Sequence, residues 1–265
     1  MRLTDLIHSY KGNEDPEVKG ISLDSREIEP GYIFAALPGV VQDGVEFIPQ
    51  AVKRGAVAVI APEGTKTAKH IPIIESKNPQ RLTSMLASEF YSPHPSTIAA
   101  VTGTNGKTST VYMAQQLWTH QNKKAASIGT LGVIGENIYN KGALTTPDSV
   151  SLSKQLNNLK AQGIDNVALE ASSHGISQHR LDGLTIKIAA FTNLSHDHLD
   201  YYNTMEDYFS AKKRLFTELL DKDGVAVINT ACPYGKRIAD ELVSKNIKVI
   251  SYGSDDADLS LNSRE

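Results

Sequence analysis

The sequence is short of residues that cross-link a chain or anchor it in a membrane. Its 265 residues include one cysteine, Cys232, which excludes an internal disulfide and has no cysteine or histidine pair nearby at metal-site spacing. No apolar stretch reaches membrane-spanning length, and Met1 to Asp5 is not followed by the apolar core of a signal peptide. We therefore expect a cytoplasmic protein without a membrane partner, in which Cys232 is structural or incidental.

Excess positive charge is also missing. The formal net charge is -3, and the basic run at 212–214 is too short to form the patch that a nucleic-acid backbone requires. This charge balance argues against nucleic acid as a partner. Hydrophobic residues make up 40% of the chain, which is enough for two domains with cores of their own.

Short apolar strands and helical patterns alternate along the chain. The first part has predicted strands at 32–37, 56–61 and 71–75 and helices at 48–54 and 79–90. The second part has predicted strands at 98–102, 125–130, 167–170, 186–191, 225–229 and 247–252 and helices at 151–162 and 205–220. Pro93 and Pro95 favour a stiff connector, so we predict one domain over 1–94 and another over 95–265.

The predicted fold class is α/β, with a small N-terminal α/β domain and a second domain built on a mainly parallel sheet. Strands that alternate with helices favour right-handed crossovers, and ligands gather at the carboxyl ends of such strands. The spacing of Val111, Ala114, Leu117 and Trp118 predicts the buried stripe of a helix. Residues 255–260 resemble the start of a further strand, so we expect a truncated chain whose second domain is incomplete at its C-terminus.

A glycine-rich turn follows the apolar run 98–101. Residues 102–109 read Thr-Gly-Thr-Asn-Gly-Lys-Thr-Ser, although Gly103 lies three residues before Gly106 where the common phosphate loop has five. Glycines let backbone N–H groups approach phosphates, Lys107 supplies a positive charge, and the Thr108 hydroxyl suits Mg²⁺. The alternative is a strand-to-helix turn with these residues by chance. We predict ATP binding by Gly103, Thr104, Asn105, Gly106, Lys107, Thr108 and Ser109.

Two further segments follow predicted strands and so reach the same edge of the sheet. Glu170 ends one strand, where a carboxylate suits either Mg²⁺ ligation or a helix cap. Residues 193–200 concentrate His196 and His198 with two carboxylates. Zinc is an alternative here, but no thiolate is near and a phosphate site calls for Mg²⁺. A polar loop with capping residues is the plainer alternative.

Two other segments carry polar groups whose role the residues alone leave open. Arg180 has a planar fork that can hold a carboxylate, although a surface arginine is the usual case. Thr145 and Thr146 precede Pro147, which by itself indicates a helix start with the proline in the first turn.

Five motifs together resemble the Mur ligases of bacterial peptidoglycan synthesis, and among these most closely the tripeptide synthetases. The motifs lie at 102–109, 144–148, 170–180, 193–202 and 211–216. In addition, Leu23-Asp24-Ser25-Arg26 followed by Pro30-Gly31 resembles the uridine-nucleotide domain of that family. The resemblance implies an N-terminal UDP-binding domain and a central P-loop-type ATPase domain. We expect the family's third, C-terminal domain to be absent from this sequence.

The resemblance implies ATP-dependent amide formation for cell wall synthesis. The D-Glu carboxylate of UDP-MurNAc-L-Ala-D-Glu attacks the γ-phosphate of ATP, and the resulting acyl phosphate reacts with a diamino acid. The sequence leaves open whether that acceptor is meso-diaminopimelate or L-lysine. Family analogy suggests that a monomer suffices.

The resemblance also assigns roles to individual residues. It implies Mg²⁺ ligation by Thr108, Glu170, His198 and Lys212, with Lys107, Lys212 and His198 as catalytic groups. It implies substrate binding by Leu23, Ser25, Thr145, Thr146, Ser172, Gln178 and Arg180. His196 receives no role. The 40–42 loop would add uridine contacts, but Val40-Val41-Gln42 replaces the His-Gln pair of some members.

Lys212 is the least intuitive of these residues, because sequence alone places it on a solvated helix face. In the family a lysine at this motif position is carbamylated (N6-carboxylated), which turns a cation into an anionic ligand for a second Mg²⁺. Carbamylation requires the neutral amine, and we expect the neighbouring Lys213 and Arg214 to favour it by like-charge repulsion.

Two other functions stay open at this stage. Folylpolyglutamate synthetases share the Gly-Thr-Asn-Gly-Lys loop, although the segments 24–26 and 170–174 argue against them. A non-catalytic module that binds a nucleotide or a UDP-sugar is the second alternative.

Overall fold

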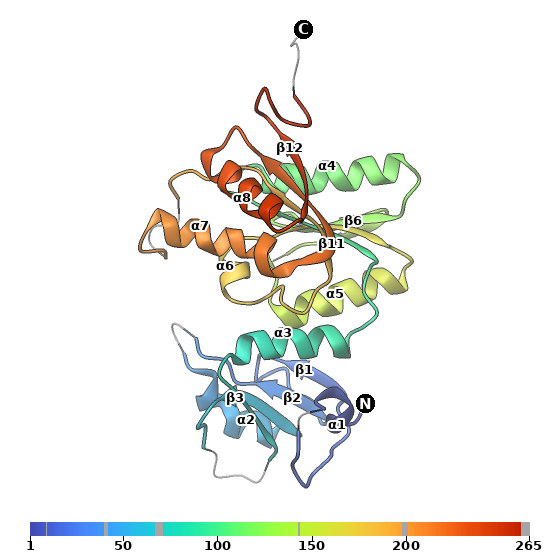
Figure 1. The fold of residues 1–265 in the computed structure, drawn as a ribbon. Coiled ribbons are helices and arrows are strands. Elements are labelled where there is room, and N and C mark those ends of the chain that lie inside the picture. Colours follow the sequence, from blue (N-terminus) through green and yellow to red (C-terminus); the bar gives the residue numbers. More distant parts are fainter. Residues whose placement is uncertain (9, 40–41, 67–70, 143, 198–200, 261–265) are drawn as a thin grey trace. The chain divides into compact units, whose positions relative to one another are not determined.

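The computed structural model describes residues 1–8, 10–39, 42–66, 71–142, 144–197 and 201–260 (Figure 1). The chain divides into two compact units. The first comprises Met1–Pro93 with Ser149–Lys154, and the second comprises His94–Asp148 with Gln155–Glu265. Each unit has its own sheet of mainly parallel strands flanked by helices, which confirms the α/β fold class.

The first unit is built on a four-stranded, all-parallel sheet in sequence order. Its strands are β1 (Gly20–Ser22), β2 (Tyr32–Ala35), β3 (Ala58–Pro62) and β4 (Ile73–Ser76). Its helices are α1 (Leu3–Leu6), α2 (Ile48–Lys53), which follows the 3-10 turn Gly44–Phe47, and α3 (Pro79–Phe90).

Both faces of this first sheet are buried. Successive residues of a strand point to opposite faces, so Ile33 and Ile60 pack in a cluster with Leu86 of α3. Phe34 and Val59, the alternate residues, pack with Ile48 of α2 and its neighbours. This two-sided burial explains why the strands are continuous apolar runs with no polar alternation.

The second unit is built on an eight-stranded sheet in the order β12-β11-β10-β5-β9-β6-β7-β8. Its strands are β5 (Thr97–Thr102), β6 (Ala125–Gly129), β7 (Gly132–Gly135), β8 (Ile138–Asn140), β9 (Asn166–Glu170), β10 (Ile186–Phe191), β11 (Leu220–Asn229) and β12 (Lys248–Tyr252). Within the described sheet, β7 pairs in antiparallel fashion with both β6 and the edge strand β8, and the other neighbouring strands are parallel.

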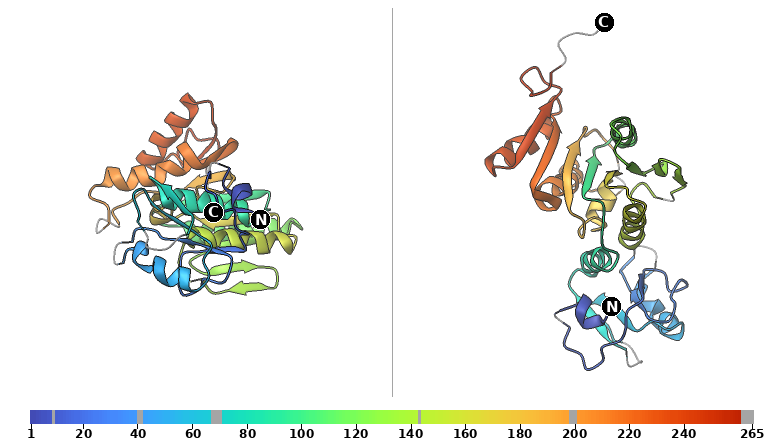
Figure 2. Two further views of the ribbon diagram at one scale, coloured as in Figure 1. Left: turned by 90° about the horizontal axis from the view of Figure 1, so that it is seen from below. Right: turned by 90° about the vertical axis from the view of Figure 1, so that its right-hand side faces the viewer.

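Helices lie on both faces of the second sheet (Figure 2). They are α4 (Lys107–His120), α5 (Ser149–Ala161), α6 (Ser173–Ser177), α7 (Met205–Arg214) and α8 (Pro233–Ser244). β5 lies between β10 and β9 and runs parallel to both. The segments that follow these three strands therefore meet at one edge of the sheet, as the α/β pattern predicts.

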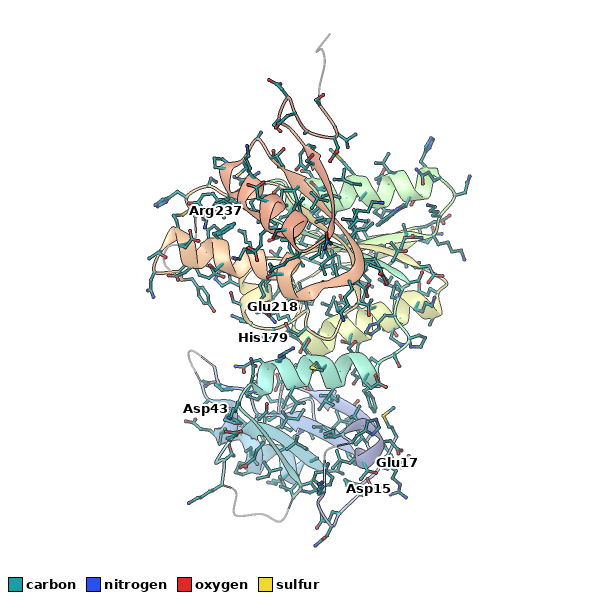
Figure 3. The ribbon with its side chains drawn as sticks, in the orientation of Figure 1. Asp15, Glu17, Asp43, His179, Glu218 and Arg237 are labelled. Atoms are coloured by element: carbon teal, nitrogen blue, oxygen red, sulfur yellow. The ribbon has the colours of Figure 1, made fainter. Side chains whose placement is uncertain are left out.

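The structure confirms most predicted elements and corrects two. The predicted helix 205–220 is confirmed as far as Leu219 and is wrong at Leu220, because α7 ends at Arg214, a π-helical turn over Leu215–Leu219 that carries Glu218 continues it, and β11 begins at Leu220 (Figure 3). The predicted buried stripe on α4 is wrong at Leu117, which is 62% exposed, whereas Val111 is buried. The π turn at the end of α7 shifts the register of the side chains there, which a 3.6-residue pattern cannot anticipate.

α7 begins with a reciprocal cap. The Thr204 hydroxyl accepts the N–H of Asp207 at 3.1 Å, and the Asp207 carboxylate accepts the N–H of Thr204 at 3.1 Å. This capping box satisfies backbone donors that the first helical turn leaves without partners.

Removing the Thr204 cap is expected to destabilise the protein. Thr204→Ala should lower the free energy of unfolding by about 1 kcal/mol. Thr110→Ala, within α4, is the matched control, and it should change the free energy by less than about 0.5 kcal/mol because alanine favours helix interiors. Urea denaturation measures both values. Equal losses in the two variants would contradict a specific role for the cap.

Candidate functional site

The loop after β5 needs glycine at two positions. Gly103 has φ +150°, and a Cβ there would lie 1.9 Å from the Thr192 hydroxyl oxygen. Gly106 has φ +86° and caps the N-terminus of α4 in the left-handed region. Both conformations are costly for residues with a side chain. The loop thus brings its backbone and the positive end of α4 to the carboxyl edge of the sheet.

Two lysine ammonium groups converge on this loop. Lys107, the first residue of α4, donates to the carbonyl oxygens of Gly103 at 2.9 Å and Thr104 at 2.8 Å. Lys212, from α7, donates to the same Gly103 oxygen at 2.9 Å. Burial lowers the pKa of Lys107, although the charges of Glu170 and Asp197 oppose the shift. The loop therefore gathers positive charge at one point.

Lys212 is a buried residue and not a solvated helix charge, because its exposure is 1%. Its ammonium lies 4.3 Å from the centre of the Tyr208 ring, one helical turn earlier. Burial first and the charge of Lys107 second lower the pKa of Lys212 to about 7, against the opposing charge of Asp197. The surroundings of Lys212 therefore favour the neutral amine over the charged form.

The expectation that Lys213 and Arg214 keep Lys212 neutral is wrong. Lys213 pairs with Glu241 at 3.0 Å, and Arg214 pairs with Asp182. Successive residues of a helix point in different directions, so both cations leave the Lys212 side of α7. Desolvation and Lys107, which is distant in sequence, cause the shift instead.

Glu170 places a buried carboxylate next to the loop. Its exposure is 1%, and its Oε2 accepts the Thr108 hydroxyl at 3.0 Å. Its Oε1 accepts the N–H of Thr130, the residue after β6, at 2.8 Å. Both hydrogen bonds to Glu170 thus come from uncharged groups, in different parts of the chain. The Glu170 carboxylate and the Thr108 hydroxyl lie side by side as two oxygen ligands of the kind that Mg²⁺ prefers.

The segment after β10 braces the phosphate loop. The Asn193 side chain accepts the N–H of Asn105 at 3.0 Å and donates to the Asn105 carbonyl at 3.2 Å. The Thr104 hydroxyl accepts the N–H of Ser195 at 3.0 Å and lies 3.3 Å from the Tyr208 hydroxyl. His196 is exposed, and His198 lies outside the described residues.

A second group of the predicted residues surrounds Arg180. Its guanidinium donates to the Thr146 carbonyl and, at 2.6 Å, to the Gln178 side chain. Thr146 is 1% exposed, and its hydroxyl lies 2.7 Å from the Glu170 carbonyl and 3.0 Å from the Ser172 hydroxyl. Thr145 lies 3.1 Å, hydroxyl to hydroxyl, from Thr130. The structure thus links the predicted substrate residues of the second unit to Glu170. α5 begins at Ser149, so Pro147 precedes the helix rather than lying in its first turn.

The predicted uridine residues lie in the first unit. Ser25 is buried, and its hydroxyl donates to the Gln50 side chain at 2.8 Å. Leu23 is partly buried against the cluster around Ile21 and Ile33. Gln42 is exposed, whereas Val40 and Val41 lie outside the described residues.

Three contributors at this site receive no role of their own from the sequence, although Asn193 lies in the segment 193–200 that is predicted to reach this edge of the sheet. Tyr208 contacts both Lys212 and Thr104, Thr130 holds Glu170, and Asn193 brackets Asn105. The spacing of four residues between Tyr208 and Lys212 is the one pattern that points to a contact, because such residues share a helix face. The other two contacts depend on strand order.

Two kinds of feature are not found in the described part of the chain, namely a cluster of three metal-ligating side chains and a membrane-spanning helix. No three His, Cys, Asp or Glu side chains there gather into a group that suits a metal ion. None of the helices it contains has the length and apolar character needed to cross a membrane.

Comparison with known proteins finds matches along most of the chain. Residues 17–91 match the model of the Mur ligase family, catalytic domain, and residues 101–264 match the Mur ligase middle domain. The UDP-N-acetylmuramoyl-L-alanyl-D-glutamate--2,6-diaminopimelate ligase of Bradyrhizobium diazoefficiens is 41% identical over 260 residues, which are 96% of this chain and 53% of that protein.

Solved structures agree with the family models. A structure named UDP-N-acetylmuramoyl-L-alanyl-D-glutamate--2,6-diaminopimelate ligase superposes with a TM-score of 0.88 at 31% identity, covering 98% of this chain and 54% of its own. A Mycobacterium tuberculosis folylpolyglutamate synthase complexed with ADP and AMPPCP superposes with a TM-score of 0.52 at 18% identity, covering 66% of this chain and 48% of its own. That second likeness concerns the fold alone.

The chain spans about half the length of the curated relatives it matches. Both of its units carry a match, and the middle-domain match contains the phosphate loop, Glu170 and Lys212. The chain therefore belongs to the Mur ligase family.

Proposed function

We propose that this protein takes part in ATP-dependent amide formation, joining meso-diaminopimelate to the D-Glu carboxylate of UDP-MurNAc-L-Ala-D-Glu. The observation that carries the proposal is the convergence of Lys107 and Lys212 on the Gly103 carbonyl, beside the pair of Glu170 and Thr108. The names of the relatives favour diaminopimelate over L-lysine as the acceptor.

The chemistry makes strict electrostatic demands. A carboxylate oxygen of the substrate bonds to the γ-phosphorus of ATP while ADP leaves, and the amine then displaces phosphate from the acyl carbon. Two anions must meet in the first step, so positive groups have to neutralise the phosphates. Lys107 and the backbone of 103–109 bind them, and Arg180 holds the substrate carboxylate.

Magnesium fits the donor set at this edge. Thr108 and Glu170 supply a hydroxyl and a carboxylate, and we propose His198 as a further ligand. Bound Mg²⁺ would neutralise charge on the phosphates as they are transferred.

Lys212 is proposed to be N6-carboxylated. Its neutral amine would bond to the carbon of CO₂ and lose a proton, which leaves an anionic carbamate as an oxygen ligand for a second Mg²⁺. The burial of Lys212 and its place at the Gly103 carbonyl support this proposal. A permanently charged lysine so close to Lys107 would face repulsion that the carbamate removes.

The remaining assignments follow the same proposal. Residues 1–94, with Leu23 and Ser25, would bind the uridine nucleotide, and residues 95–265 would bind ATP. In the substrate site, Thr145, Gln178 and Arg180 would contact the dipeptide. Thr146 and Ser172 would hold these three residues in place from the protein interior, since Thr146 is buried. We propose a cytoplasmic monomer.

Turnover by the protein encoded in the complete natural gene tests this function. ADP release should require ATP, UDP-MurNAc-L-Ala-D-Glu and meso-diaminopimelate together, and L-lysine should support it poorly. Omission of any one substrate is the control. ADP release with a folate in place of the muramyl dipeptide would support a folylpolyglutamate synthetase. Nucleotide binding with no ADP release under any combination would support a non-catalytic module.

Substitution of Lys212 tests the carbamate. Lys212→Ala should lower kcat by about 10³-fold or more, because an anionic ligand near the γ-phosphate is lost. The Kd for the UDP-substrate should stay within about twofold. Lys212→Arg is the matched control, since it keeps a cation but cannot capture CO₂, and it should be as inactive as the alanine variant. Carbon-13 bicarbonate should give an NMR carbamate signal in the wild type only. Near-normal turnover of either variant would remove Lys212 from the site.

A further inference from the structure

The turn that carries Arg180 has a histidine where the backbone favours glycine. α6 ends with the N–H of His179 donating to the Ile176 carbonyl at 3.1 Å and the N–H of Arg180 donating to the Gly175 carbonyl at 2.9 Å. This is the Schellman pattern, in which the left-handed residue is usually glycine. His179 occupies that position with φ +57°. Unlike glycine, a histidine at this position can make a side-chain contact.

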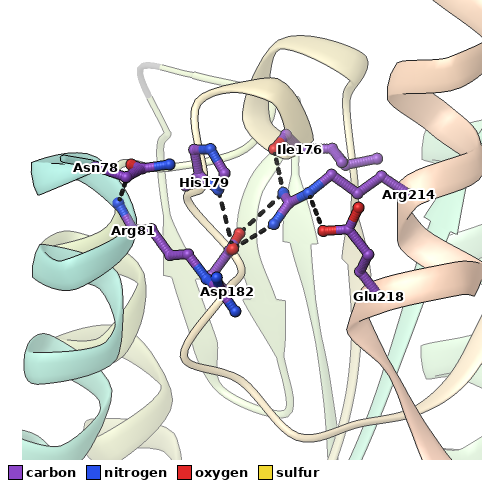
Figure 4. Close-up of polar contacts among 7 residues, drawn as sticks. All are labelled: Asn78, Arg81, Ile176, His179, Asp182, Arg214 and Glu218. Atoms are coloured by element: carbon purple, nitrogen blue, oxygen red, sulfur yellow. Dashed lines mark hydrogen bonds and ion pairs between the residues drawn. The ribbon is translucent and has the colours of Figure 1, made fainter.

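The His179 ring contacts a buried carboxylate. Its Nδ1 lies 2.9 Å from Oδ1 of Asp182, whose side chain is 2% exposed (Figure 4). The carboxylate only accepts hydrogen bonds, so Nδ1 carries the proton. Burial alone would raise the pKa of Asp182, but hydrogen bonds from Arg214 and His179 hold it below its ordinary value. Asp182 therefore stays ionised.

Arg214 joins this carboxylate to α7. Its guanidinium donates to both oxygens of Asp182, at 3.0 Å to Oδ2. The same Nη1 donates to the Ile176 carbonyl at 2.8 Å, and Nε donates to Glu218 at 2.7 Å (Figure 4). Arg214 thus holds both the end of α6 and the carboxylate that fixes His179.

The Asp182 cluster, defined here as His179, Asp182 and Arg214, connects two parts of the candidate site. Arg180 directly follows His179 in the turn. Lys212 lies two residues before Arg214, in the last turn of α7. α6 and α7 pack against each other. None of the three cluster residues has a role in the function proposed above, yet together they set where Arg180 lies relative to the helix of Lys212.

We propose that Asp182 is a positioning residue, which holds the turn of Gln178 to Arg180 against α7 so that Arg180 is preset for the carboxylate of the acidic substrate. This inference rests on the proposed function for the identity of that substrate. The positioning itself concerns residues 175–182 and α7 alone, so it has a readout that needs no substrate.

Three substitutions test the proposal in the protein encoded by the complete natural gene. Asp182→Asn keeps the shape but removes the charge that holds Arg214 and His179. His179→Gly keeps the left-handed backbone, which glycine adopts freely, and removes the contact with Asp182. Arg237→Lys is the matched control, because Arg237 of α8 forms a similar two-pronged ion pair with Glu206 of α7, but an exposed one, away from the turn (Figure 3).

We expect the substitutions to change the KM for one substrate and not for the other. In Asp182→Asn and His179→Gly the KM for UDP-MurNAc-L-Ala-D-Glu should rise about tenfold, while the KM for ATP should stay within about twofold. His179→Gly should keep the melting temperature of the wild type within about 2 °C, since glycine relieves the left-handed backbone. Arg237→Lys should change neither KM. An unchanged KM for the muramyl dipeptide in folded Asp182→Asn would overturn the proposal, as would equal rises for both substrates.

Amide hydrogen exchange tests the positioning role even if the wild type shows no turnover. The N–H groups of His179 and Arg180 should exchange about tenfold faster in Asp182→Asn than in the wild type or in Arg237→Lys. Exchange at wild-type rates would overturn the positioning role. Absent turnover with faster exchange would refute the proposed function and leave the positioning role standing.

Discussion

The site depends on one electrostatic constraint, the approach of two lysine side chains to a single carbonyl oxygen. Lys107 and Lys212 each donate to the Gly103 oxygen at 2.9 Å. Like charges so close together in a partly buried place repel each other strongly. The arrangement is tolerable if one amine is neutral or modified, or if anions approach. It therefore favours both phosphate binding and the carbamate proposed for Lys212.

The rest of the second unit keeps the two lysines close to the Gly103 carbonyl. β5 ends at the phosphate loop, and its neighbours β9 and β10 deliver Glu170 and the 192–197 segment to the same edge. α7 carries Lys212, and Tyr208 of the same helix contacts both Lys212 and Thr104 of the phosphate loop. The Asp182 cluster lies at the C-terminal end of α7. Each charged group is thus fixed by backbone or by a partner from another element, which keeps the site preorganised.

The sequence predicts the parts of the site that rest on local pattern. The phosphate loop follows one buried strand and Glu170 ends another, and parallel-sheet topology brings the two to the same edge. The reason for the low pKa of Lys212 lies beyond such reasoning, because it comes from burial and from Lys107, 105 residues earlier. Sequence neighbours suggest Lys213 and Arg214 instead, but a helix turns them away. Asp182 likewise has no sequence signal, because its partners Arg214 and His179 meet it only in three dimensions.

The central claim is that a substrate carboxylate is phosphorylated at this edge of the sheet, and oxygen isotope transfer tests it most directly. UDP-MurNAc-L-Ala-D-Glu labelled with oxygen-18 in the D-Glu carboxylates is turned over with ATP and meso-diaminopimelate, and the released phosphate is analysed by mass spectrometry. An acyl phosphate intermediate predicts one labelled oxygen in each phosphate, because the phosphate leaves with the oxygen that attacked. Unlabelled phosphate from a productive turnover would contradict the account.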